Sequence, residues 1–190
     1  ASINSQGDWA GMESVIYWQQ GNGELHERAS MGKAILAGAM AHGKPGVLVS
    51  PVGEMRCALY HGALFDKSTA VISPLDEDDV AAIYCYVQSQ DFKKEIKLLD
   101  SKVAVTNKTL VKVPFDLGYW KSIADERFPN GLPRPYSNNP TQWIFHGHPQ
   151  PATDPLQVAV ARLLGYGWPA ETDAKMELAD EAIAWVARSK

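Results

Sequence analysis

Two histidines separated by a single residue, His146 and His148, form the pair in this 190-residue chain that could most simply bind a metal ion. Alternate residues of a β-strand share a face, so both imidazoles could reach one cation. The spacing offers no third ligand, and Pro149 interrupts a strand directly after the pair. Histidines that bond to loop carbonyls are the alternative interpretation, so a structural role and a small metal-dependent hydrolase both stay open.

No other arrangement in the sequence predicts catalysis, because neither a Ser-His-Asp pattern nor a carboxylate pair stands out. Gly21 and Gly23 lie in a polar turn without a helical pattern behind it, so they do not predict a phosphate-binding or methyl-donor loop. Cys57 and Cys85 lack the spacing of a zinc or redox site, which favours buried free thiols. On their own, these residues therefore favour a binding module over an enzyme.

The composition is that of an ordinary globular protein, with 45% hydrophobic and 21% charged residues. No apolar run has the length of a membrane-spanning helix, and the N-terminus lacks the pattern of a signal peptide, so we expect a cytoplasmic protein. The formal net charge of -4 argues against a partner that is bound by charge alone. Residues 92–112 nevertheless contain six lysines and only two acidic residues. This run is either a surface for an anionic partner or a solvated helix face.

Two helical patterns follow three β-prone runs, which cover residues 47–50, 56–60 and 69–73. In the first pattern, apolar residues recur at helical spacing from Val80 to Val87, and Asp76 is placed to cap the helix. The second pattern begins behind Ser89 and carries its apolar stripe on Phe92, Ile96 and Leu99. Lysines occupy the other side, which predicts a helix with its stripe on the core.

Residues 103–105 and 109–113 predict two strands joined by a turn at Asn107 and Lys108, with Pro114 ending the second strand. Strands, helices and hairpin in this order predict an α+β (mixed α/β) fold. It would contain a small twisted sheet with two packed helices, followed by a loop-rich arm and two C-terminal helices.

The predicted division places a recognition-like α/β domain at residues 1–115, with part of its N-terminal region missing. A loop-rich arm and helical extension at residues 116–190 would pack on it. Residues 128–136 contain too much Pro and Gly for regular structure. We expect the two helices of the extension near residues 155–164 and 173–188.

A strand and turn, FDKSTAVI at residues 65–72, precede two helices, DVAAIYCYVQS at 79–89 and DFKKEIKLL at 91–99. A polar turn and a strand that ends in VPF at 113–115 come next. This order resembles the target recognition domains of bacterial restriction and modification systems, such as type I specificity subunits. Four further motifs are LVKVPFDL at 110–117, PNGLP at 129–133, PTQWIFHGHP at 140–149 and LQVAVARLLGY at 156–166. They are similar to the region behind the catalytic domain in large Eco57I-like adenine-N6 DNA methyltransferases.

The resemblance implies that this chain chooses a DNA site for a restriction-modification or phage-defence enzyme. A methyltransferase domain of the same polypeptide, outside these residues, would bind S-adenosylmethionine and transfer the methyl group, and a nuclease could accompany it. The stretch SNNPT at residues 137–141 lacks the second Pro and the aromatic of the Asn-Pro-Pro-aromatic motif of such enzymes. The implied partners are therefore double-stranded DNA and that catalytic domain, and this chain alone should not methylate DNA.

The polar tetrad at residues 106–109 fits the tip of a DNA-reading hairpin. Asn bonds bidentately to adenine, Lys to guanine or phosphate, and Thr offers a hydroxyl group and a methyl group. Other lysines would contact the phosphates, and neighbouring strand ends would supplement the tip. The predicted DNA-binding residues are Arg56, Lys67, Ser68, Lys102, Thr106, Asn107, Lys108 and Thr109. Asn107 and Thr109 also fit a purely structural role in a turn.

An interaction module without DNA contact is the alternative function. It would dock another subunit of a defence complex through the Pro-rich arm and an exposed aromatic patch. The aromatic residues proposed for this patch are Trp120, Tyr136, Trp143 and Trp168.

Overall fold

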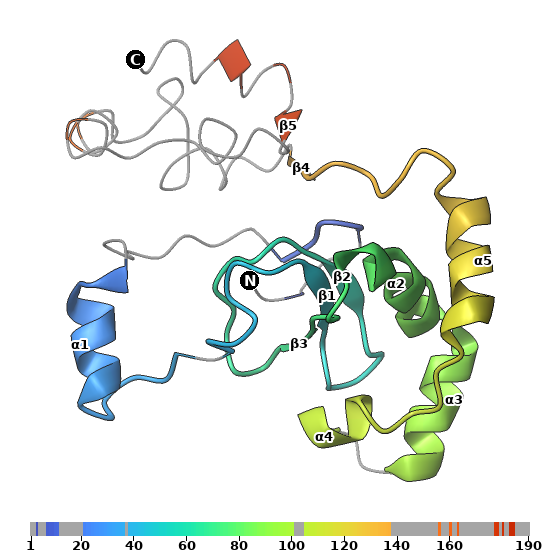
Figure 1. The fold of residues 1–190 in the computed structure, drawn as a ribbon. Helices are drawn as coiled ribbons and strands as arrows, with labels where there is room; N and C mark the ends of the chain where they lie inside the picture. Colours follow the sequence, from blue (N-terminus) through green and yellow to red (C-terminus); the bar gives the residue numbers. More distant parts are fainter. Residues whose placement is uncertain are drawn as a thin grey trace. The chain divides into compact units, whose positions relative to one another are not determined.

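The computed structural model describes residue 3, residues 7–11, 21–36, 38–100 and 105–137, and scattered residues from 156 onward. The chain divides into two compact units, Ala1–Gly11 with Ile16–Pro133, and Met12–Val15 with Arg134–Lys190. A small antiparallel sheet and several helices make the fold α+β, as predicted (Figure 1). Within the described residues, no helix is both long enough and apolar enough to cross a membrane.

The sheet of the first unit consists of β1 (Gly46–Val49), β2 (Cys57–Tyr60) and β3 (Ala70–Ile72). Their order is β2-β1-β3, and both neighbours run antiparallel to β1. Gly46 allows the close approach of β3, because a Cβ there would lie 2.4 Å from the Ile72 carbonyl oxygen. The three predicted strands are confirmed.

The central strand β1 is buried on both faces. Val47 and Val49 belong to a large hydrophobic cluster that includes the helices, whereas Leu48 belongs to a smaller cluster with Ala58 and Tyr60. This division follows from the alternation of side chains along a strand.

The two predicted helices are confirmed as α2 (Val80–Gln88) and α3 (Gln90–Leu99). The Asp76 carboxylate accepts a hydrogen bond from the Asp78 N–H and begins the short 3-10 turn η2 (Glu77–Asp79), which leads into α2. Ser89 then caps α3, because its Oγ accepts from the Phe92 N–H at 3.1 Å. Phe92 and Ile96 are buried as predicted, but Leu99 is 50% exposed.

Helix α5 (Leu117–Arg127) lies where the sequence predicts a loop-rich arm. Asp116 caps it by accepting from the Tyr119 N–H at 3.0 Å. The helix packs against α2 (Figure 1). It buries Trp120, whose ring centroid lies 5.1 Å from that of Tyr86. The compact first unit therefore continues through α5 to Pro133, whose carbonyl accepts from the Trp9 Nε1–H at 3.0 Å.

The predicted hairpin at residues 103–113 is wrong in its described part. Residues 107–110 form the one-turn helix α4 (Asn107–Leu110). The Val105 N–H donates to the Pro51 carbonyl at 2.9 Å, and residues 109–113 form no strand with which residue 105 could pair. Burial of Val105 and Leu110, 8% and 3% exposed, outweighs the β propensity of the segment. Lys102 and residues 103–104 lie outside the described residues.

Two short strands, β4 (Tyr136–Ser137) and β5 (Glu177–Leu178), pair in parallel in the second unit. The position of β5 contradicts the predicted start of a helix at residue 173, although Asp180 and Ile183 are helical. Leu156, Val160 and Leu163 are also helical, in agreement with the predicted helix near residues 155–164, but their side chains are 72%, 45% and 86% exposed. His146 and His148 lie outside the described residues.

In the first unit, helix α1 (Glu24–Ser30) directly follows the turn at Gly21 and Gly23, where no helix was predicted. None of its residues is buried, so the sequence offers no apolar stripe by which to recognise it.

Candidate nucleic-acid interface

The three strands share one end at which most of the predicted DNA-binding segments meet. Val49, the last residue of β1, pairs with Cys57, the first residue of β2, and with Ala70, the first residue of β3. We call this the Val49 end of the sheet. Arg56 immediately precedes β2, and the pair Lys67–Ser68 lies just before β3, so both segments enter the sheet here.

Helix α4 reaches the same end through a backbone contact. The Val105 N–H donates to the carbonyl of Pro51, which lies two residues behind Val49. Residues 106–109 therefore start beside the β1–β2 loop. The fold thus brings together three of the four predicted segments; the fourth, Lys102, lies outside the described residues.

The hydroxyl groups predicted to contact DNA are engaged locally. The Thr106 and Thr109 Oγ1 atoms lie 3.0 Å apart in a hydrogen bond with each other. The Ser68 N–H and Oγ both donate to the Asp66 carboxylate, at 2.9 and 2.6 Å. These three residues stabilise turns, so their interpretation as base-reading groups loses support.

Four of the other predicted residues are described. Lys67, Asn107 and Lys108 are exposed at the Val49 end. Arg56 is 44% exposed at its side chain, and its Nε lies 3.6 Å from the Glu54 carboxylate. Asn107 and Lys108 begin α4, and α4 contacts α3. On α3, the Lys94 side chain is 72% exposed and lies 3.5 Å from Asp91, and Lys97 is exposed as well.

A pocket of about 420 Å³ opens beside Arg56. Four charged residues line it, Asp8, Glu54, Arg56 and Lys93, together with Gly7, Met55, Cys57, Tyr84, Val87 and Gln88. The pocket cannot be recognised in the sequence, because its walls come from four separate stretches of chain. Met55 in the pocket wall has a φ of 50°, which is rare for a residue other than glycine. This unusual backbone conformation marks the site in the structure but cannot be read from the sequence.

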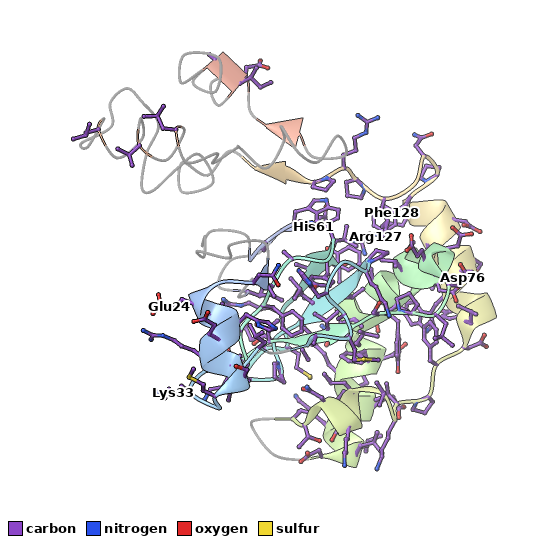
Figure 2. All side chains as sticks on the ribbon, turned by 60° about the vertical axis from the view of Figure 1, so that its left-hand side comes forward. Glu24, Lys33, His61, Asp76, Arg127 and Phe128 are labelled. Atoms are coloured by element: carbon purple, nitrogen blue, oxygen red, sulfur yellow. The ribbon has the colours of Figure 1, made fainter. Side chains whose placement is uncertain are left out.

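The polar wall of the pocket is fixed by contacts behind it. The Tyr84 hydroxyl donates to Asp8 Oδ1 at 2.6 Å, and the Asp8 carbonyl accepts from the Leu59 N–H of β2. The Gln88 Oε1 accepts from an Arg127 Nη1–H. Arg127 and Phe128 lie next to each other at the end of α5, with the guanidinium carbon 4.9 Å from the ring centroid (Figure 2).

Two side chains of the pocket, Cys57 and Tyr84, hold their protons more tightly than usual. Burial raises the pKa of Cys57 to about 11, although the positive charges of Lys93 and Arg127 oppose the shift. Burial, followed by the hydrogen bond to Asp8, also raises the pKa of Tyr84 well above its usual range. Both side chains are therefore neutral at physiological pH, and a neutral buried thiol is a poor nucleophile.

The described residues contain no group of three or more His, Cys, Asp and Glu side chains that could hold a metal ion. The predicted pair His146 and His148 lies elsewhere in the chain, so a metal site there stays an open prediction. Comparison with protein-family models, curated proteins and solved structures found no match to this chain.

Proposed function

We infer that this chain is the DNA-recognition module of a restriction-modification or phage-defence adenine-N6 methyltransferase that works in the cytoplasm. The observation that carries the proposal is the meeting of separate polar segments at the Val49 end of the sheet. Each of those segments is a DNA-binding candidate by its residue types alone, independently of where the fold places it. Their convergence is what a surface that reads DNA requires, because base contacts and phosphate contacts must be made together.

Each exposed residue has a role in this proposal. Asn107 would bond bidentately to adenine, and Lys108 would contact guanine or a phosphate. Lys67 on one side and Lys94 and Lys97 on the other would contact phosphates and set the register of the duplex.

The charge distribution supports this orientation despite the net charge of -4. The acidic run Asp76–Asp79 follows β3, whose last residue Ile72 pairs with Val47, so the run leaves from the end of the sheet opposite to Val49. Repulsion between these acids and DNA phosphates falls with distance and salt. A duplex at the Val49 end would therefore meet the lysines before the acidic run.

Methyl transfer would take place in a partner domain that binds S-adenosylmethionine, as the resemblance implies. The neutral Cys57 and Tyr84 fit this division of labour, because neither supplies a nucleophile or a base. This chain would hold the target duplex and present it to the catalytic domain.

Duplex binding by the 190-residue chain tests the proposal. In fluorescence anisotropy with a pool of random duplexes at rising salt, Lys108→Ala should weaken binding. The variant should also lower the slope of log K against log salt by about 0.9 for each phosphate that the lysine neutralises. Lys44→Ala is the matched control, since it removes the same charge two residues before β1, at the opposite end. Equal effects of the two variants, or no duplex binding at low salt, would refute the proposal.

One observation favours the alternative, a protein-interaction module. Val111 and Tyr119 are 72% and 55% exposed, and Phe115 and Leu117 between them are each 37% exposed. Trp120, which was expected on such a surface, is instead 8% exposed and part of the core. A Val111→Asp, Tyr119→Asp variant that binds duplex normally but loses a co-purifying subunit would support this function.

A further inference from the structure

The proposed duplex contacts at Asn107, Lys108 and Lys67 make no use of the pocket beside Arg56. Its volume of about 420 Å³ lies within the usual range for small-ligand sites, roughly 300–1,000 Å³. Apolar side chains of Met55 and Val87 and polar groups share its lining. It therefore has the features of a separate binding site.

The pocket carries charges of both signs. Asp8 and Glu54 would repel a purely anionic ligand, and Arg56 and Lys93 would repel a purely cationic one. A matching ligand has a hydrogen-bond donor in one part and a negative charge in another.

Asp8 is the better-fixed of the two carboxylates. Its backbone carbonyl accepts from Leu59 N–H at 2.6 Å, and its Oδ1 accepts from the Tyr84 hydroxyl at 2.6 Å. A carboxylate can accept about four hydrogen bonds, so this arrangement leaves acceptor capacity for a ligand. By contrast, the Glu54 side chain is 74% exposed at the rim.

Gln88 is oriented by the same kind of second contact. Because its Oε1 accepts from Arg127, its amide group offers N–H donors for other contacts. A donor and a fixed carboxylate acceptor therefore line the same pocket, which suits the edge of a nucleobase.

We propose that this pocket binds one nucleotide whose base carries an exocyclic amino group. The amino group would donate to Asp8, the Gln88 amide would donate to an acceptor on the same edge of the base, and the phosphate would lie between Arg56 and Lys93. Thymine lacks such an amino group and would present a carbonyl oxygen to the carboxylate. The neutral thiol of Cys57 adds no charge that would repel the phosphate.

This inference deepens the proposed function and rests on it for the source of the nucleotide. If the proposed function holds, the nucleotide is one extruded from the bound DNA, a step known from enzymes that work on a base, while methyl transfer itself belongs to the partner domain. A free mononucleotide offers the same chemistry. The two sources are separated by comparing dCMP with oligonucleotides.

The test is an NMR titration of the ¹⁵N-labelled 190-residue chain. Addition of dCMP or dAMP should shift the backbone amides of Gly7, Asp8 and Arg56, and dTMP should bind about 10-fold more weakly. Asp8→Asn should reduce this preference for dCMP over dTMP. Lys93→Ala should weaken dCMP binding about 10-fold, and Lys44→Ala, which lies outside the pocket at the opposite end of the sheet, should leave it unchanged. An unchanged spectral pattern in the free variants would show that they fold.

The inference would be overturned if dTMP, the zwitterion glutamine or inorganic phosphate alone caused shifts equal to those that dCMP causes. It would also be overturned if millimolar dCMP caused no shift. Titration with a duplex distinguishes the two proposals. If dCMP binds and the duplex does not, the pocket stands and the DNA-recognition function fails. If the duplex binds through Lys108, but dCMP shifts no amide and Lys93→Ala does not weaken binding, only the pocket inference fails.

Discussion

The hydrogen bond between Tyr84 and Asp8 should be a measurable anchor of the N-terminal segment. Tyr84 is fully buried, and its ring stacks on Phe128 with centroids 6.3 Å apart. Tyr84→Phe removes one oxygen atom and keeps this packing. A hydrogen bond to a charged group contributes about 1.5–3 kcal/mol. Because Asp8 is only half-buried and water can replace the missing donor, we expect a decrease of ~1–2 kcal/mol in the free energy of unfolding.

Urea denaturation of a double-mutant cycle measures this bond. Tyr84→Phe, Asp8→Ala and the double variant should show a coupling free energy of about 1 kcal/mol. Tyr119→Phe is the control, because that side chain is 55% exposed and should change stability by less than about 0.5 kcal/mol. A coupling of zero, or equal effects of the two tyrosine variants, would refute the anchoring role.

Three further predictions concern the core, a helix cap and the sheet. Burial raises the pKa of Cys57 in the folded protein from its ordinary 9.0 to about 11. The contribution of this thiol to the free energy of unfolding is therefore present in full below pH 9 and is lost as the pH rises to 11. This loss should reach up to ~2 kcal/mol, and denaturation curves of Cys57→Ala should lack that part of the fall. Ser89→Ala removes the cap on the Phe92 N–H and should cost about 1 kcal/mol by urea denaturation. Gly46→Ala places a Cβ against the Ile72 carbonyl and should lower the melting temperature measured by circular dichroism.

Matched control variants can contradict the predictions for Gly46→Ala and Ser89→Ala. Gly53→Ala meets no atom within 4 Å and should cost only the strain of its positive φ, so a larger effect there than at Gly46 would contradict the steric argument. Ser122→Ala removes a hydroxyl inside α5; if it costs as much as Ser89→Ala, capping is not the cause.

The strands and the two central helices could be predicted because local pattern and burial agree. In α3, for example, the Ser89 cap and the spacing of Phe92 and Ile96 indicate the same helix, and both apolar residues are buried. The fold class follows from the order of these elements.

The hairpin failed because tertiary burial opposes local propensity. The β-branched residues around the tetrad favour strands, but the chain buries Val105 and Leu110 by making one helical turn between them. Helix α5 was missed for a related reason, since only Trp120 and Ala124 of its eleven residues are buried. Its sequence therefore carries little apolar periodicity.

The pocket could not be predicted because its geometry is entirely long-range. Asp8 and Tyr84 are 76 residues apart in the chain, and only the folded sheet and helices bring them together. Arg56 was predicted to bind DNA from its place beside a strand, but neither of its neighbours in the pocket, Asp8 and Lys93, could be inferred from that position.

The central claim is that the Val49 end of the sheet reads DNA sequence. Selection of bound duplexes from a random pool by the 190-residue chain tests it most directly. We expect an enriched motif that changes at an adenine position in Asn107→Ala, while Lys94→Ala lowers affinity for all duplexes alike. No enriched motif, or the same motif after Asn107→Ala, would contradict it.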